Sequence, residues 1–383
     1  ILPQSKSFFL FGPRQTGKTS LIQAQFSREV TLSLNLLHHS EFERLSKNPE
    51  ILINEVKNRP MGTTHVLIDE IQKIPALLDE VHAVLESKDP PHFILTGSSA
   101  RKLKASGANL LGGRALTRRL YPFTHLEIGE SFQLEQALAT GTLPPIYLER
   151  EEGLRVDLLR SYAETYIREE IQMEAVVRNI GTFLRFLSVA AHEEGNLLNY
   201  SSIGRESGTS PVTVKEYFHV LEDTLIGFFL FPFSRSARKR TAQHPRFYLF
   251  DGGVKRALTK QLTVPLEPRT SPFGREFEAW VIREARALAD YTNKDLEFSF
   301  YRTERGAEVD LVIQTPRNRS WAVEIKSSDA PSPADFQNGL ASLAQATEVH
   351  EKICVCRAPR ESRVSDVQIL PWRTFFQKLL QEA

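Results

Sequence analysis

Length and composition describe an ordinary globular protein. The chain has 383 residues, room for two to four domains, with 41% hydrophobic and 25% charged residues. A net charge of +1 provides no global field, so any polyanionic partner must be held by local basic patches. Cys354 and Cys356 lie two apart, where strand side chains point the same way and seldom bridge, which excludes a disulfide framework and predicts a reducing, cytoplasmic setting. The longest near-apolar run, Leu225 to Phe233, is too short for a bilayer, so no membrane partner is expected.

The apolar patterns predict a multidomain α/β protein with four blocks. In residues 1–130, short apolar runs alternate with helical patterns, which is typical of a parallel sheet. Residues 131–195 carry apolar residues mainly at helical spacing. Residues 196–262 show two short helical stretches and then two strand-like runs, 226–231 and 246–250. Residues 263–383 open with a Pro-rich segment and predict helices at 275–289 and 334–344 and strands at 296–301, 309–313, 321–325 and 352–355.

The segment GPRQTGKT, Gly12 to Thr19, follows the apolar run SFFLF and opens a helical pattern. Gly12 and Gly17 allow a backbone that turns successive amides onto phosphate oxygens, at the positive end of the next helix. Lys18 is expected to reach the β- and γ-phosphates, and the Thr19 hydroxyl to ligate Mg²⁺. The alternative is a glycine-rich turn that matches the four fixed positions of the pattern GxxxxGK(S/T) by accident. Average residue usage gives such a match in roughly 1% of chains of this length. We therefore predict an ATP site that includes Gly12, Pro13, Arg14, Gln15, Thr16, Gly17, Lys18, Thr19 and Ser20.

Polar residues follow the next apolar strands. In HVLIDEIQKIP, Asp69 and Glu70 end the run Val66 to Ile68. Because parallel strands present their carboxyl ends at one crevice, Asp69 is predicted to hold magnesium beside Thr19, and Glu70 to polarise the attacking water. An Asp-Glu pair standing alone is more often a helix N-terminus, but its place downstream of the phosphate loop favours catalysis. Thr96 or Ser98, after the strand FILT, is predicted to contact the γ-phosphate or position the water.

Arg114, in LLGGRALTRR, is the candidate cation that stabilises the transferring phosphoryl group, in its own subunit or a neighbouring one. A surface arginine beside a glycine turn is the alternative interpretation. The competing arginines are Arg101, Arg118, Arg119 and Arg168.

The middle of the chain has the order helix, turn, helix, strand. Ser210 can cap a helix from Pro211, whose buried stripe is Val214, Tyr217, Phe218 and Leu221 and whose open face includes Lys215. A basic stretch then separates two strands, as in a winged helix that faces a phosphate backbone, although winged helices also serve protein contacts. The predicted nucleic-acid contacts are Lys215, Arg235, Arg238, Lys239 and Arg240.

The last block places charges inside apolar strands. Asp310 interrupts one strand, and Glu324 and Lys326 lie on one face of the next, with Ile325 pointing away. Carboxylates from neighbouring strands form a hard oxygen site for Mg²⁺ or Mn²⁺, and Lys326 would orient or deprotonate a metal-bound water that attacks a phosphodiester. Glu278, on the preceding helix, is expected to complete the metal site through a water. The alternatives are a solvated strand face or an ion-paired relic of such a site.

The motifs GPRQTGKT, LIDEIQKIP, LTGSSARKL, GGRALTRRLYPFTHLE, SYAETYIREEI and EVDLVI with VEIK, in this order, resemble those of prokaryotic AAA+ ATPases with a C-terminal uncharacterised domain. The last block is similar to the PD-(D/E)xK nuclease superfamily, with Val309 in place of its proline. The resemblance implies a P-loop AAA+ core in 1–130, a helical lid or linker in 131–195, a winged-helix-like domain in 196–262 and a nuclease-like fold in 263–383. It implies a homo-oligomer, a hexameric ring being one form, while the second sensor arginine of AAA+ lids has no clear counterpart. Lys18, Thr19, Asp69 and Glu70 match the ATPase motifs, and Asp310, Glu324 and Lys326 the nuclease motif.

These features predict a Mg-ATP-dependent ATPase that acts on DNA by remodelling, translocation or processing, with branched DNA among its substrates. A nucleotide-dependent switch whose inactive nuclease fold binds a partner is the first alternative. A toxin-antitoxin or defence regulator that binds operator DNA through the winged helix is the second.

Overall fold

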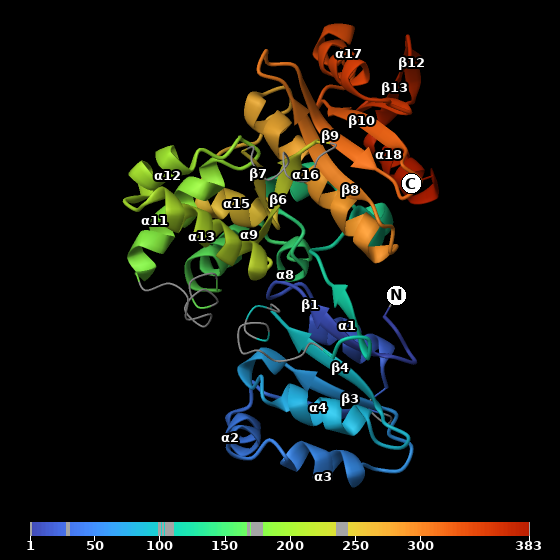
Figure 1. The fold of residues 1–383 in the computed structure, drawn as a ribbon. Coiled ribbons are helices and arrows are strands. Elements are labelled where there is room, and N and C mark those ends of the chain that lie inside the picture. The colour runs from blue at the N-terminus through green and yellow to red at the C-terminus, as the bar shows by residue number, and fades with distance from the viewer. Residues whose placement is uncertain are drawn as a thin grey trace. The chain divides into compact units, whose positions relative to one another are not determined.

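A computed structural model of the chain describes residues 2–27, 31–98, 101, 103, 111–166, 169, 179–234 and 244–382. They form two compact units, whose elements Figure 1 colours in chain order. The first unit is built from Ile1–Tyr121 with shorter segments that include Glu169 and His219–Ile226. The second is built from Pro122–Arg168, Arg178–Phe218 and Gly227–Ala383. These bounds differ from the four predicted blocks, and the four-block division stays a prediction.

The first unit contains a five-stranded sheet that is parallel throughout, in the order β2–β3–β4–β1–β5. Its strands are β1 (Ser7–Phe11), β2 (Thr31–Asn35), β3 (His65–Asp69), β4 (His92–Gly97) and β5 (Ala115–Arg119). Its helices are α1 (Lys18–Gln25), α2 (His39–Lys47), α3 (Ile51–Lys57) and α4 (Leu77–Leu85), with a 3₁₀ turn, η2 (Ile71–Lys73), directly after β3.

The apolar character of the central strands determines where the sheet presents its ends. Every residue of β1 and β3 is buried, as expected for parallel strands covered on both faces. Strand β4 lies between them, with Phe11 opposite Gly97 and Ile68 opposite Leu95. The carboxyl ends of these three strands therefore meet at one edge, which is where parallel sheets place ligands. The predicted parallel α/β core is confirmed.

The second unit combines many helices with a mixed sheet. The helices before the sheet are α6 (His125–Ile128), η3 (Gly129–Ser131), α7 (Leu134–Thr140), α8 (Pro144–Tyr147), α9 (Glu152–Ser161), the π-helix η4 (Tyr162–Tyr166), α11 (Ile180–His192), α12 (Tyr200–Ser207) and α13 (Pro211–Asp223, which crosses the unit boundary). The later helices are α15 (Gly252–Leu258), α16 (Ser271–Tyr291), η5 (Pro333–Asp335), α17 (Gln337–Ala346) and α18 (Trp372–Glu382). Ser210 caps α13 as predicted, accepting a hydrogen bond from the Thr213 amide at 3.1 Å. None of the helices within these described ranges is long and apolar enough to cross a membrane.

The mixed sheet has eight strands in the order β12–β13–β11–β10–β9–β8–β6–β7. They are β6 (Gly227–Pro232), β7 (Arg246–Leu249), β8 (Glu297–Arg302), β9 (Glu308–Gln314), β10 (Ser320–Ile325), β11 (Glu351–Cys356), β12 (Ser362–Val364) and β13 (Val367–Pro371). The hairpin of β6 and β7, predicted as part of a separate winged helix, pairs with β8 through Phe231 and Pro232. Its strands thus extend the terminal sheet inside one compact unit.

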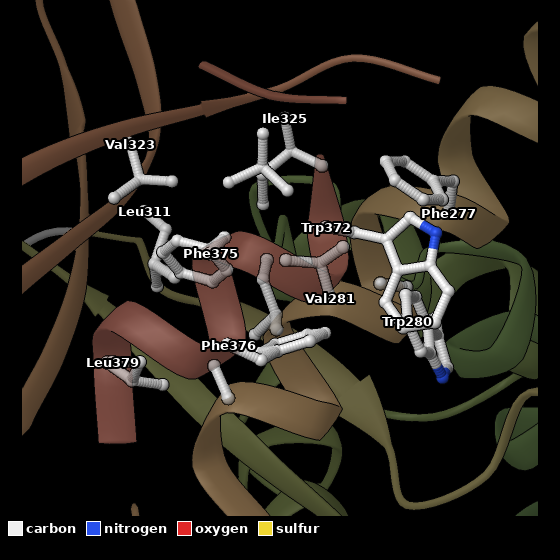
Figure 2. Close-up of a cluster of buried hydrophobic side chains, with 14 of the residues drawn as sticks. Phe277, Trp280, Val281, Leu311, Val323, Ile325, Trp372, Phe375, Phe376 and Leu379 are labelled. Atoms are coloured by element: carbon white, nitrogen blue, oxygen red, sulfur yellow. The ribbon is translucent and has the colours of Figure 1, made fainter. Parts of the chain in front are cut away.

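Helices cover both faces of this sheet. Figure 2 shows α16 and α18 directing aromatic and aliphatic side chains toward Leu311, Val323 and Ile325 on β9 and β10. Trp280 packs edge-on against Trp372 and Phe376, at ring distances of 5.1 and 5.6 Å. The opposite face, with Val312 and Ala322, packs against Phe336, Leu340 and Leu343 at and within α17. Both cysteines lie buried and unbridged on this second face.

An irregularity in β9 re-aims its side chains. Tyr301 pairs with Val309 and Ser299 with Val312, so β9 contains one more residue than β8 between these pairs. Val309 and Leu311 consequently pack on opposite faces although they lie two apart. A bulge of this kind disturbs the alternation of a strand and redirects a side chain. Asp310 is the residue between them.

Candidate functional site

The backbone of the phosphate loop adopts left-handed conformations at a glycine and at one non-glycine residue. Gly17 has φ of 92° and Gln15 has φ of 64°, both in the left-handed region. A Cβ on Gly12 would lie 2.4 Å from the Leu120 carbonyl oxygen, so a side chain there has no room. Thr16 closes the turn by donating its hydroxyl to the Pro13 carbonyl at 2.9 Å. The loop between β1 and α1 is therefore shaped by close backbone approach, as an anion-binding loop requires.

Lys18 is directed back into this loop. Its side chain is buried, and Nζ donates to the carbonyl oxygens of Gly12 at 2.7 Å and Pro13 at 3.0 Å. These bonds hold the ammonium group over the loop, where a phosphate would also lie. Arg14 is half-buried and its guanidinium lies 3.3 Å from the Glu169 carboxylate, while Ser20 is exposed on α1.

Asp69 links the loop to two strands. Its Oδ2 accepts a hydrogen bond from the Thr19 hydroxyl at 3.4 Å, and its Oδ1 accepts one from the Thr96 hydroxyl. Thr96 is fully buried and its oxygen also accepts from the Glu70 amide at 3.1 Å. The structure therefore brings Asp69 beside Thr19, as predicted, and adds a contact between Asp69 and Thr96 that the sequence did not indicate. A hydroxyl beside a carboxylate is a set of hard oxygen donors that suits Mg²⁺.

Glu70 and Ser98 are joined by a residue that the sequence analysis did not single out. Glu70 adopts φ of 63° and begins the turn η2. The Gln72 amide nitrogen donates to Glu70 Oε2 and to the Ser98 hydroxyl, the latter at 3.1 Å. Gln72 is 3% exposed. The sequence feature that could have identified Gln72 is its place between the apolar residues Ile71 and Ile74. A polar side chain in a buried turn needs hydrogen-bond partners, which here belong to the site.

Arg114 does not contact the loop residues described above in this structure. It is exposed beside β5 and donates to Glu86 at 2.6 Å. Of its competitors, Arg101 pairs with Asp223 at 2.7 Å, Arg118 donates to the neighbouring Thr117 carbonyl at 3.1 Å, and Arg119 ends β5 with its side chain exposed. Arg168 lies outside the described residues. A role for Arg114 across a subunit interface stays a prediction.

In the second unit, the predicted nuclease residues do meet. Lys326 Nζ lies 2.7 Å from Glu324 Oε2 and 3.3 Å from Asp310 Oδ2. The Ile325 amide also donates to Asp310 Oδ2, at 2.8 Å. Glu324 and Asp310 are buried, and Ile325 packs on the other face as predicted. The bulge in β9 and the end of β10 thus bring two carboxylates and one ammonium group together.

The metal site predicted at these acids stays a prediction. Within the described ranges, no three acidic, His or Cys side chains are arranged to hold a metal ion. Glu278, expected to ligate through a water, instead receives Arg246 at 3.3 Å and the Tyr248 hydroxyl at 3.4 Å. Lys326 lies within ion-pairing distance of both Asp310 and Glu324. Lys326 beside the two acids is expected both of the predicted metal site and of the ion-paired alternative.

Burial also changes the proton affinity of these acids. Burial, and then the charge of Asp310, raises the pKa of Glu278 from 4.5 to about 7. The same two causes raise the pKa of Glu324, against the pull of Lys326. Arg246 is itself 4% exposed and stacks on Phe300 at 4.7 Å. Arg246 and Glu324 are buried and Glu278 is half-buried, and each has a partner of opposite charge, as charges withdrawn from water require.

The predicted nucleic-acid contacts are only partly within the structure. Lys215 is exposed on α13, which agrees with the predicted open face. Arg235, Arg238, Lys239 and Arg240 lie outside the described residues.

Comparisons with known proteins describe the chain in three parts. Residues 4–129 match the family described as "AAA domain", and residues 131–264 and 273–375 match two domains of unknown function, DUF8612 and DUF4143. An uncharacterised protein of Haemophilus influenzae is 22% identical over 270 residues, which cover 64% of this chain and 67% of that protein.

A solved STAND-type signal-transduction ATPase with a tetratricopeptide repeat sensor, from Pyrococcus horikoshii, is 11% identical with a TM-score of 0.25. The match covers 75% of this chain, which spans 43% of that protein's length. The sequence match and the loop geometry together support a P-loop ATPase domain in residues 4–129.

Proposed function

We propose that this domain hydrolyses Mg-ATP and that hydrolysis drives work on DNA. The observation that carries the hydrolysis part is the hydrogen-bonded chain Thr19–Asp69–Thr96, which joins the phosphate loop to the ends of β3 and β4. A strand end that merely began a turn would not need a hydroxyl group on each carboxylate oxygen, one of them from the fully buried Thr96. The arrangement supports a magnesium site beside bound phosphates.

The protein's residues divide the chemistry among them. Thr19 and Asp69 would hold magnesium, which supplies charge neutralisation for the transferring phosphoryl group. Lys18 exchanges its bonds to the Gly12 and Pro13 carbonyls for bonds to phosphate oxygens, so its positive charge is already at the loop. Glu70, beside Asp69, orients the attacking water.

DNA is proposed as the partner because basic residues are concentrated in one part of the sequence, although the net charge of the whole chain is close to zero. Lys215 is exposed on a capped helix, and the basic stretch that follows β6 belongs to the same part of the sequence. Sequence-independent binding to phosphates would make the interaction strongly salt-dependent. A homo-oligomer, with Arg114 acting on a neighbouring subunit, is part of this proposal.

The test is ATP turnover measured alone and with single-stranded, duplex and four-way junction DNA. We expect stimulation by at least one DNA form, a steep loss of that stimulation with added salt, and no turnover in Lys18→Ala. Turnover that is indifferent to every DNA form would refute the DNA part and leave the ATPase part standing. Light scattering with and without ATP tests the oligomer.

A nucleotide-controlled switch with an inert terminal domain is the second candidate. One observation favours it, namely that Arg246 pairs with Glu278, the acid that was expected to complete the metal site. Supercoiled DNA with Mg²⁺ or Mn²⁺ separates the candidates. Nicking that is lost in Asp310→Ala and kept in Lys18→Ala would establish a nuclease centre, whereas slow ATP turnover without nicking supports the switch.

A further inference from the structure

Gln72 is a polar side chain in a buried turn, a position that apolar residues usually occupy. It is the middle residue of η2, directly behind the catalytic strand end, and is 3% exposed. Burying an amide costs free energy unless its donors are satisfied. Both bonds of its nitrogen go to side chains of the proposed site, Glu70 and Ser98. Its oxygen has no hydrogen-bond partner within the described residues.

The orientation of this amide is determined by Glu70. With the amide reversed, its oxygen would face the carboxylate oxygen of Glu70, and two acceptors would repel one another. The unpartnered oxygen is therefore the cost of directing both N–H groups at Glu70 and Ser98. If position 72 only filled space, leucine or methionine would fit with similar volume. Neither would leave a buried polar atom without a hydrogen-bond partner, so the glutamine is explained by its two N–H bonds.

Ser98 connects Gln72 to the phosphate loop through the backbone. It follows Gly97, whose carbonyl oxygen accepts a hydrogen bond from the Gly12 amide at 3.3 Å. The end of β4 thus contacts the first glycine of the loop, and Thr96 in the same segment contacts Asp69. Bound phosphates and the Glu70 carboxylate consequently share one supporting segment, residues 96–98.

We propose that Gln72 is a positioning residue for ATP hydrolysis, which fixes the Glu70 carboxylate against β4 so that it can orient the attacking water. This inference rests on the proposed ATPase function. A positioned base contributes roughly 10²–10⁴-fold to rate, and a base that rotates freely loses part of that factor. Gln72 would therefore influence the chemical step and not the binding of nucleotide.

Gly97 gives an independent way to move Gln72. A Cβ on Gly97 would lie 2.5 Å from Gln72 Oε1 and 3.3 Å from a ring carbon of Phe11. Gly97 is not in the positive-φ region, so alanine is acceptable to its backbone. Gly97→Ala should displace the amide while leaving both of its hydrogen-bonding partners in place.

The experiment measures kcat and KM for ATP, and the Kd of a fluorescent ATP analogue, in Gln72→Leu, Gln72→Glu and Gly97→Ala. Gln25→Leu, an exposed substitution at the end of α1, is the matched control. We expect kcat to fall by roughly 10- to 100-fold in Gln72→Leu and less in Gly97→Ala, with KM and Kd within about threefold of wild type. Gln72→Glu should lose the most, because it sets a second carboxylate against Glu70.

The outcomes separate the inference from the function on which it rests. An active wild type with kcat in Gln72→Leu within about twofold of it would overturn the positioning role and leave the ATPase intact. Equal losses in kcat and analogue affinity in both Gln72→Leu and Gly97→Ala would also overturn it, since they indicate a structural role. A wild type that binds the analogue but shows no ATP turnover would instead refute the proposed function itself.

Discussion

Replacing Thr96 by valine tests the support of Asp69 most directly. Thr96 is fully buried and bonded on both sides, donating to Asp69 Oδ1 and accepting from the Glu70 amide. Valine has nearly the same shape, so no cavity forms and only the two hydrogen bonds are lost. A bond to a charged acceptor is worth about 1.5–3 kcal/mol, and a buried unpaired amide costs about 1–3 kcal/mol. Allowing for partial relaxation, we expect a local loss of about 3 kcal/mol in Thr96→Val, while Thr96→Ser retains the hydroxyl and most of the stability.

The assay must report on the first unit alone. The three tryptophans, Trp280, Trp321 and Trp372, all belong to the second unit, so their fluorescence is an internal control that should not change. Amide hydrogen exchange of peptides from β3 and β4 reports the opening of the site itself. About 3 kcal/mol corresponds to roughly 100-fold faster exchange in Thr96→Val than in Thr96→Ser. Equal exchange in the two variants would refute the network as the support of Asp69.

Two further predictions concern the phosphate loop and the half-buried carboxyl group of Glu278. Gly12→Ala should weaken binding of an ATP analogue by roughly tenfold or more, because the added Cβ would clash with the Leu120 carbonyl oxygen. In the control Gly153→Ala, the added Cβ has no heavy atom nearer than 3.8 Å, so this variant should bind the analogue as wild type does. Unchanged affinity in Gly12→Ala would contradict the close approach. The pKa of Glu278 is raised from 4.5 to about 7 in the folded protein, so its contribution to stability is complete below pH 4.5 and is lost as pH rises through about 7. In Glu278→Gln the urea-unfolding midpoint, followed by tryptophan fluorescence, should decline less over this range than in wild type, and parallel declines would count against the raised pKa.

Much of the fold could be predicted because buried strands are legible in a sequence. The run SFFLF is β1 from end to end. The predicted strand 309–313 is one residue shorter than β9 at each end, and 321–325 is one residue shorter than β10 at its start. Such runs are apolar because both faces of the sheet are covered. Strand β2 was not predicted, since most of its residues are only partly buried and its sequence, TLSLN, carries no continuous apolar signal. Short edge strands such as β12 escape detection for the same reason.

The position of a candidate site residue could be predicted where it depends only on the residue's place at the end of one strand. The place of Asp69 follows from strand order and the position of the loop, and the structure brings it to Thr19. The ion pairing of the second site was not predictable in this way. Arg246 reaches Glu278 only because β7 joins the far edge of the sheet beyond β8, a pairing between segments distant in sequence. The bulge that aims Asp310 likewise depends on register and not on local composition.

The conformation of Glu70 provides a test of the site that does not depend on any ligand. Residues two apart do not face each other in a helix, yet Glu70 and Gln72 are bonded, because Glu70 lies in the left-handed region at φ of 63° before η2 begins. That conformation costs a non-glycine residue roughly 1–2 kcal/mol, which a glycine would not incur. Both Glu70→Gly and Glu70→Ala remove the carboxylate and should abolish ATP turnover. Glycine is normally the less stable of the two, by about 1 kcal/mol in a helix, but here the order should invert, with slower hydrogen exchange of the β3–η2 peptide in Glu70→Gly. If the usual order held, the side chain at position 70 would be free of strain, and the geometry that joins Glu70 to Gln72 would be wrong.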